Sequence, residues 1–234
     1  MANFPTHLVG AAVGSTAVAA FLAHMQTVSV PRALLLVGVG TVGGLLPDID
    51  SDHSVPARWV RGVVATALSL MVVARLWSTN PPANALALGA CVWVTVYVVF
   101  ERVVTRLTVH RGIMHSIPFG LLCTFASAIA AHRLALLPAV EAWWLAAFVG
   151  IGFFVHLMLD EIAAVDLTSA RVKRSFGSAL KLWDPNGTFK TLVVYALLAA
   201  VLSSLPAYED FMHQAQALGT ALGAWVATPF LRVG

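Results

Sequence analysis

The sequence predicts an all-α membrane protein, a polytopic helical bundle of seven or eight transmembrane helices that forms a single membrane-embedded domain over residues 1–234. Three observations predict this class. The chain is 59% hydrophobic and only 11% charged, whereas soluble domains have roughly 25% charged residues. Its mean hydropathy is +0.84. The apolar residues also occur in runs of about 20, the length that a helix needs to cross a bilayer.

The predicted spans follow one another with no long polar insertion between them. They cover residues 7–25, 31–47, 59–77, 83–101, 114–137, 142–162, 188–205 and 215–231. The segment 31–47 is short and rich in glycine, so we expect it to be kinked, re-entrant or packed closely against a neighbour. The segment 215–231 is also marginal as a span. We therefore divide the domain into a motif-bearing part, about 4–190, and accessory C-terminal helices, 188–234.

The positive charges predict the orientation in the cell membrane. If the N-terminus is cytoplasmic and the spans alternate, 11 of the 14 Lys and Arg residues fall inside, and only Arg32, Arg75 and Arg133 fall outside. Lys and Arg are enriched in cytoplasmic loops, so we expect a multi-pass protein of the inner membrane with a cytoplasmic N-terminus. No run of basic residues indicates direct nucleic-acid binding.

In this orientation the polar motifs converge on one membrane face. His7 opens the first span, PDIDSDH (47–53) closes the second, VHRGIMHS (109–116) joins the fourth and fifth, and HLMLDE (156–161) closes the sixth. The histidines expected at the other face are scattered singly. Four His- and Asp-bearing segments at one face predict a metal centre at the cytoplasmic boundary.

HLMLDE carries a pair of ligand-type residues one helical turn apart. His156 and Asp160 lie four positions apart, so they share a face of the helix. An Asp at the centre of a membrane helix costs about 2.5–3.5 kcal/mol, and less near the interface. The pair suits a metal or a carboxylate-oriented histidine, although a single interhelical hydrogen bond would also explain it. Glu161 is rotated by about 100° from Asp160, so we expect it beside the centre, as a general base or as a partner of a ligand.

VHRGIMHS offers two histidines and an arginine. In a continuous helix His110 and His115 would lie about 140° apart and could not bind one ion. Gly112 permits a bend that turns both rings inward. Ser116 suits the N-cap of the following helix. Arg111 either binds a phosphate as a planar fork or simply marks the cytoplasmic edge.

The three aspartates of PDIDSDH are spaced as at the start of an EF-hand loop. The sixth position of that loop is His53 instead of Gly and the twelfth is Trp59 instead of Glu, which excludes a calcium loop. Carboxylates with imidazole suit Zn²⁺, Mn²⁺ or Fe. We expect Pro47 to end the helix and to place Asp48 and Asp50 in a loop, either as ligands or as part of a solvated turn.

The order of these motifs resembles a known family. An N-terminal T-H, then PDIDSDH, HRGIMHS and HLMLD, together with RVKRSFGSALKLWDP (171–185), is similar to the YdjM-type family of inner-membrane-associated proteins classed as metal-dependent hydrolases. Some members are reported to associate with the LexA repressor. The resemblance covers roughly residues 4–190.

That family is grouped distantly with zinc-dependent phospholipase C and the P1-type nucleases, which are all-α zinc enzymes. The resemblance implies a ligand order of an early His, an Asp, further histidines and an H-x-x-x-D helix. Asp48 or Asp50 fills the Asp position, and the other matching residues are His7, His110, His115, His156 and Asp160. In the soluble enzymes the N-terminal tryptophan also binds metal, whereas this chain begins MANF, so the number of ions stays open.

The resulting hypothesis is a membrane-bound, metal-dependent hydrolase of phosphoesters such as lipid headgroups. A divalent metal, zinc before manganese or iron, would be held by His7, Asp50, His110, His115, His156 and Asp160. The metal would lower the pKa of a bound water and neutralise charge on the phosphoryl group. Asp48 or Glu161 would act as the base, and Arg111 would bind the phosphate.

Three other functions remain open from the sequence. A metal-free lipid phosphatase would use His156 as a nucleophile, but the S-R and P-S-G-H motifs of that class are missing. A proton or metal-ion transporter would use intramembrane His and Asp equally well, but would need them along a path through the bilayer. A non-catalytic adaptor would dock a cytosolic partner, for example through the basic stretch 171–181, without any metal.

Overall fold

A computed structural model describes residues 3–50, 55–99, 112–166, 171–172 and 180–231. Within these ranges the helices are joined by turns and short irregular segments, and the strands are one antiparallel pair of two residues each, β1 (Val165–Asp166) and β2 (Arg171–Val172). This confirms the predicted all-α class. The α-helices are α1 (Phe4–His24), α2 (Val30–Gly43), α3 (Val55–Leu76), α4 (Pro82–Val99), α6 (Ile117–Arg133), α7 (Ala139–Ala164), α8 (Thr188–Leu202) and α9 (Glu209–Leu231). Two short 3₁₀ helices, η1 (Leu46–Asp50) and η3 (Pro185–Gly187), complete the set.

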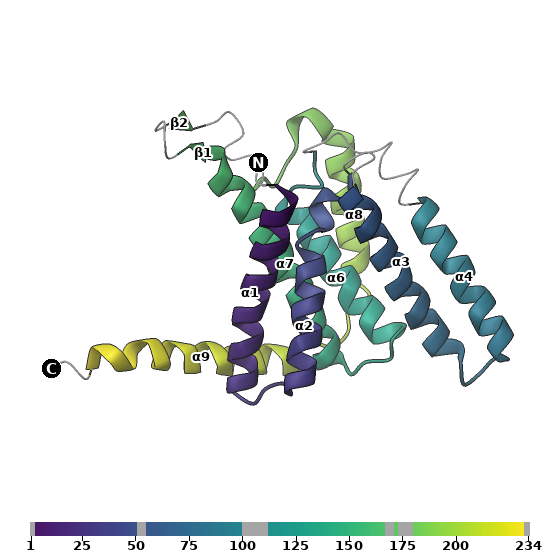
Figure 1. Ribbon diagram of the computed structural model, residues 1–234, viewed down its shortest axis with the longest axis horizontal. Coiled ribbons are helices and arrows are strands. Elements are labelled where there is room, and N and C mark those ends of the chain that lie inside the picture. The colour runs from purple at the N-terminus through teal and green to yellow at the C-terminus, as the bar shows by residue number, and fades with distance from the viewer. Residues whose placement is uncertain (1–2, 51–54, 100–111, 167–170, 173–179, 232–234) are drawn as a thin grey trace.

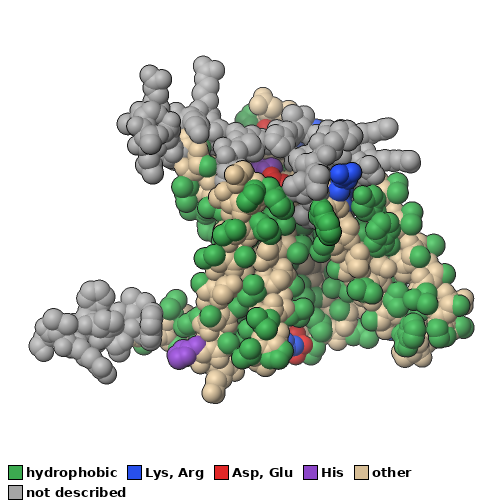
Figure 2. Space-filling model, in the orientation of Figure 1, with side chains coloured by type: hydrophobic (Ala, Val, Ile, Leu, Met, Phe, Trp, Pro, Cys, Tyr) green, Lys and Arg blue, Asp and Glu red, His purple; other side chains and the backbone are tan. Residues whose placement is uncertain are grey.

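Each predicted span coincides with one of these helices. Among the described residues, five segments are long and apolar enough to cross a membrane, namely Phe4–His24, Val30–Asp48, Pro82–Val99, Ala139–Ala164 and Pro185–Leu202, and Ile117–Arg133 is a shorter apolar helix. The marginal segment 215–231 lies in α9, which is not one of the five and runs crosswise at the lower end of the bundle (Figure 1). Hydrophobic side chains cover the flanks of the molecule, as expected for a surface in contact with lipid (Figure 2).

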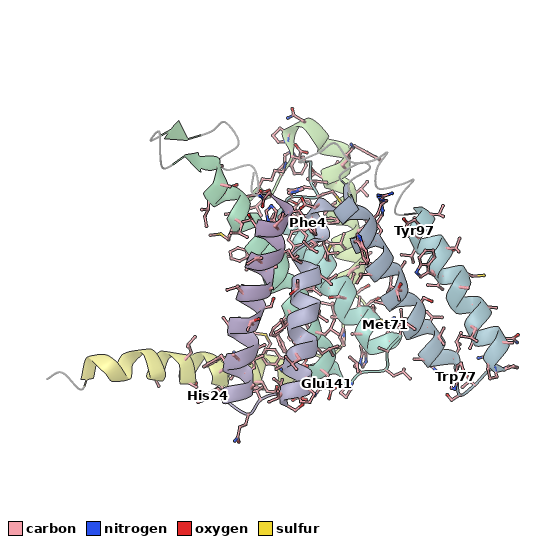
Figure 3. All side chains as sticks on the ribbon, in the orientation of Figure 1. Phe4, His24, Met71, Trp77, Tyr97 and Glu141 are labelled. Atoms are coloured by element: carbon pink, nitrogen blue, oxygen red, sulfur yellow. The ribbon has the colours of Figure 1, made fainter. Side chains whose placement is uncertain are left out.

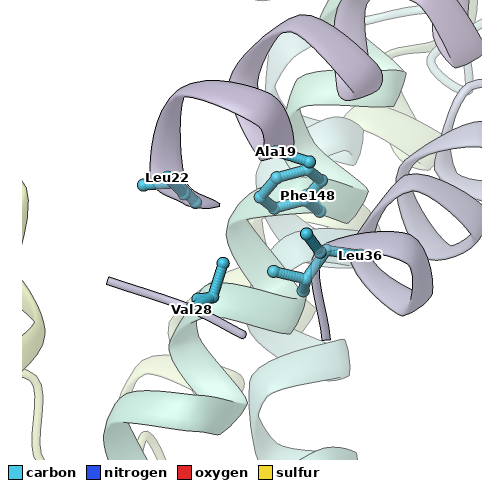
Figure 4. Packing of buried hydrophobic residues seen from close by; sticks show 6 residues of the cluster. Ala19, Leu22, Val28, Leu36 and Phe148 are labelled. Atoms are coloured by element: carbon cyan, nitrogen blue, oxygen red, sulfur yellow. The ribbon is translucent and has the colours of Figure 1, made fainter. Parts of the chain in front are cut away.

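Helix α7 is the centre of the bundle. It packs against α1, α2 and α6, and more than half of the residues in its most apolar stretch are buried. Phe148 of α7 lies in a cluster with Ala19 and Leu22 of α1, Val28 of the connecting turn and Leu36 of α2 (Figure 4). Because lipid is as apolar as these side chains, such contacts hold helices together by close packing more than by the hydrophobic effect.

Glycines bring α2 into backbone contact with α7. A methyl group at Gly152 would overlap the carbonyl oxygen of Gly40, and one at Gly43 would lie 2.8 Å from the Cα of Val149. A methyl group at Gly44 would overlap the side chain of Ala11 on α1. The close packing expected for the glycine-rich segment is therefore confirmed, because only a residue without Cβ fits at these points.

The prediction that Pro47 ends the helix and begins a loop was wrong. Helix α2 already ends at Gly43, and Pro47 lies inside η1. The amide of Leu45 donates to the Val42 carbonyl at 3.0 Å, and that of Asp48 to the Leu45 carbonyl at 3.3 Å. These three-residue spacings tighten the chain into 3₁₀ geometry, and proline fits a first turn because its missing N–H would have no partner there.

Helices α3 and α4 form a hairpin beside the bundle. Ser69 of α3 donates to the Gly89 carbonyl of α4 at 2.8 Å, and the Trp93 indole donates to Thr66 at 3.1 Å. Outside the hairpin, α3 makes its most extensive contacts with η1. The hairpin therefore joins the bundle mainly at the end where α1 begins and α2 finishes (Figure 1).

The glycine contact predicts a position-specific effect on stability. Gly43→Ala places a methyl group against the α7 backbone, which cannot move aside, and we expect a loss of about 1–3 kcal/mol. Gly38→Ala on the same helix is the matched control, because nothing lies within 4 Å of the added methyl. Thermal unfolding of both variants in detergent should show a lower Tm for Gly43→Ala alone. Equal Tm values would contradict the close packing of α2 on α7.

Candidate metal centre

The centre is built on the last turns of α7. His156 and Asp160 are both buried, one turn apart on the same face, as their spacing predicts. Their nearest polar atoms, His156 Nε2 and Asp160 Oδ2, are 3.9 Å apart. That distance is too long for a hydrogen bond between these two side chains. The two side chains instead face a common space.

The orientation of His156 is set by α2. Its Nδ1 lies 2.7 Å from the carbonyl oxygen of Gly44. A carbonyl only accepts, so Nδ1 carries the proton and donates it, which leaves the lone pair on Nε2. Nε2 is buried and makes no hydrogen bond with the described part of the chain. A histidine held in this way by its second nitrogen is the usual arrangement of a metal ligand.

His7 of α1 completes a first group with these two residues. Its ring stacks on that of His156, with centroids 3.7 Å apart and an angle of 11° between the planes. His7 Nε2 is 3.4 Å from Asp160 Oδ1, so each carboxylate oxygen of Asp160 faces one imidazole. The donor atoms of the three side chains lie within 4.8 Å of one another, and all three residues are buried.

Asp48 of η1 and His115 form a second group with the same His156. Asp48 Oδ1 is 3.6 Å from His115 Nε2 and 3.7 Å from His156 Nε2. His115 lies in the turn that the sequence predicts around Gly112, closed by its own amide donating to the Gly112 carbonyl at 3.2 Å. Ser116 then caps α6, as predicted, by accepting from the Phe119 amide at 3.4 Å.

The spacing of the donor atoms fits a metal ion better than a set of hydrogen bonds. Zinc binds N and O ligands at about 2.0–2.1 Å, so two ligands at a tetrahedral angle lie about 3.3–3.4 Å apart. The four His–Asp separations given above run from 3.4 to 3.9 Å, whereas N–H···O hydrogen bonds measure about 2.7–3.2 Å. The two groups are therefore able to hold a metal ion with little rearrangement.

The sharing of His156 limits how many ions the groups can hold together. Its Nδ1 is committed to Gly44, and Nε2 has one lone pair, so His156 can bind one ion only. Either a single ion takes donors from both groups, or two ions lie side by side and only one of them is bound by His156. Both arrangements use the same five side chains, His7, Asp48, His115, His156 and Asp160.

Of the remaining predicted site residues, Glu161 is the one whose side chain is described. Glu161 is buried next to Asp160, but its Oε1 accepts from the backbone amide of Leu180 at 3.3 Å. Asp50 ends η1, and nothing is described of its side chain. His110 and Arg111 lie outside the described residues.

The structure also adds a residue that motif analysis missed. The carbonyl of Gly44 contributes no side chain, so its role in orienting His156 could not be read from residue type. The signal was indirect: the glycines of 38–44 allow the close approach of α2 that brings this carbonyl to the imidazole.

Comparison with known proteins places the chain in a family. The family described as YdjM inner membrane protein matches residues 1–227 of the 234. The chain belongs to this family. The match spans both the helices that build the centre and most of α9, and it confirms the resemblance found from the four motifs. No curated protein and no solved structure matches the chain.

Metal binding by this YdjM-family protein should appear as thermal stabilisation. An ion that binds only the folded state at 100 times its Kd adds about 2.7 kcal/mol. We therefore expect zinc to raise the Tm of the purified protein and a chelator to lower it. His156→Gln should abolish both effects. The matched control His132→Gln should keep them, because His132 bonds the Leu137 carbonyl at the far end of α6. An identical zinc response in both variants would exclude His156 as a ligand.

Proposed function

We propose that this protein is a membrane-embedded, metal-dependent hydrolase of phosphoesters, with a lipid headgroup as the substrate. The observation that carries the proposal is the pair of His/Asp groups sharing His156, built from α1, η1, the turn before α6 and the end of α7. Bringing buried imidazoles and carboxylates together from four separate segments is costly in a bilayer unless they serve a ligand.

The chemistry of the donors favours a small set of metals. All five are imidazole nitrogens or carboxylate oxygens, which suit zinc, manganese or iron. The thiols do not contribute: Cys91 is exposed on α4, and Cys123 packs among apolar side chains of α6 and α7. When bound, such an ion would make water nucleophilic near neutral pH and neutralise charge on a phosphoryl group.

Among the five donors, Asp48 is the best placed to accept a proton from the attacking water. Its side chain is 21% exposed, whereas those of His7, His115, His156 and Asp160 range from 0 to 7%. Solvent and substrate would therefore approach from the Asp48 side. Glu161, the other candidate base, is better explained as a positioning residue that holds the chain at Leu180.

A lipid substrate agrees with the position of the centre. The donor residues lie at the upper end of the bundle, where α1 begins and α7 ends (Figure 1), and many hydrophobic side chains are exposed on the flank below it (Figure 2). A centre at the boundary of the bilayer can reach a headgroup while the acyl chains stay in lipid. We propose that this boundary is the cytoplasmic one, with the N-terminus inside, because of the excess of Lys and Arg expected on that side.

The proposal is tested by comparing the metal content of the wild type with that of variants at two neighbouring residues of α7, Asp160 and Glu161. We expect at least about one zinc, manganese or iron per chain in the detergent-purified protein, measured by elemental analysis. Asp160→Asn should lose most of it, because an amide is a poor ligand. Glu161→Gln is matched in burial and position but should keep it. Absence of metal from the wild type, even after incubation with excess ions, would contradict the proposal.

Turnover tests the reaction itself. Phosphate or headgroup release from phospholipid vesicles and from a chromogenic phosphodiester should depend on the metal. Asp48→Asn should lower kcat by about 10²–10⁴, the usual loss of a general base, more than its loss of metal explains. A fully loaded protein that hydrolyses none of these substrates would favour transport of the ion instead, and docking of a cytosolic partner without metal would favour an adaptor.

A further inference from the structure

Helix α3 carries an arginine whose charge has no partner in the described part of the chain. Arg61 is 3% exposed, and its Nε makes no hydrogen bond with any described residue. No ion pair joins its guanidinium to a carboxylate among the described residues. Its one described contact with another aromatic or charged group is Tyr97 of α4, whose ring centroid lies 6.0 Å from the guanidinium carbon.

A buried arginine without a counter-charge is a candidate to bind an anion. Removing a guanidinium from water without a counter-charge is among the most unfavourable events in folding, more so beside a bilayer. A ring face at 6.0 Å compensates only a small part of this cost. Arginines in membrane proteins are accordingly found paired or lining a site for a charged ligand.

Arg61 lies at the same end of the molecule as the metal centre. Val64, one turn further along α3, packs against Leu45 in a cluster that includes Leu8 and Leu46. Leu8 follows the ligand His7, and Leu46 precedes Asp48 within η1. Figure 3 places Tyr97 near the upper end of α4, at about the height of Phe4 in the first turn of α1. The contact between α3 and η1 thus joins the arginine to the element that carries Asp48.

We propose that Arg61 binds the phosphate group of an anionic ligand at the edge of the metal centre. This rests on the proposed hydrolase function and names the residue that would hold its substrate. A guanidinium presents a planar fork of N–H donors that matches two phosphate oxygens, a geometry that the ammonium of a lysine lacks. From the sequence we expected Arg111 to bind the phosphate, whereas Arg61 was one of the 11 Lys and Arg residues expected on the cytoplasmic side.

The phosphate could belong to a lipid or be free in the cytoplasm, and the ligands of the experiment separate these sources. The full-length protein, purified in a neutral detergent and depleted of lipid, is titrated with inorganic phosphate, with dihexanoylphosphatidylglycerol and with dihexanoylglycerol. The last has the same acyl chains without phosphate. Binding is followed by calorimetry, with the Tm at saturation as a second measurement, and the metal content of each sample is recorded.

The variants are chosen to isolate the fork of Arg61. Arg61→Gln removes the charge and should weaken binding of phosphate-bearing ligands at least about tenfold, as expected for charge-assisted hydrogen bonds. Arg61→Lys keeps the charge without the fork and should weaken it less. Arg58→Gln is the matched control, because Arg58 is one turn earlier on the same helix but exposed. The affinity of this variant for the phosphate-bearing ligands should stay within about twofold of that of the wild type.

The proposal is supported if the wild type binds both phosphate ligands, or the phospholipid alone, and Arg61→Gln loses this binding. Binding of the phospholipid alone identifies a lipid as the source of the phosphate. Equal affinity in wild type and Arg61→Gln, or no phosphate-dependent binding or rise in Tm in the wild type, overturns it. If Arg61→Gln does not fold, the proposal is tested by the phosphate affinity of Arg61→Lys and by the rise in the wild-type Tm with phosphate-bearing ligands. Arg61-dependent binding in a protein that holds no metal would overturn the hydrolase but leave this site. A metal-loaded protein with no Arg61 effect would overturn this site alone.

Discussion

The hydrogen bond between His156 and the Gly44 carbonyl links the packing of the bundle to the chemistry of its centre. Gly44 follows the last residue of α2, where backbone carbonyls have no partner within the helix. In a bilayer such a carbonyl must find a donor inside the protein. His156 Nδ1 supplies it at 2.7 Å, and the same bond turns Nε2 toward Asp48 and Asp160. One contact therefore completes a helix end and fixes the tautomer of the shared ligand.

That contact depends in turn on residues without side chains. Gly40 and Gly43 on α2 and Gly152 on α7 let two backbones approach where any Cβ would collide. The helix ends that converge there, together with η1 and the turn at Gly112, bring residues 7, 48, 115, 156 and 160 to one end of the molecule. The centre is therefore a consequence of close helix packing, and its rigidity is of the kind that preorganised ligands need.

Hydropathy was enough to predict each described α-helix, because a bilayer requires long apolar runs that few other structures contain. The i, i+4 spacing of His156 and Asp160 likewise required no knowledge of tertiary structure. His7 could be joined to them only by noticing that four polar motifs share a face, since a lone histidine at a helix start carries no signal. Three features could not be predicted from the sequence, because each depends on which parts of the fold pack against it. They are the 3₁₀ turn of η1, the role of the Gly44 carbonyl and the burial of Arg61.

The central claim is that these imidazoles and carboxylates bind a metal directly, and X-ray absorption spectroscopy of the zinc-loaded, detergent-purified protein tests it most directly. The account predicts a first shell of N and O atoms at about 2.0–2.1 Å with the outer-shell scattering of imidazole rings, and no sulfur at about 2.3 Å. In His156→Gln the imidazole scattering should fall or the metal should be lost. A spectrum of a hydrated ion, a sulfur shell, or an unchanged spectrum in that variant would contradict the account.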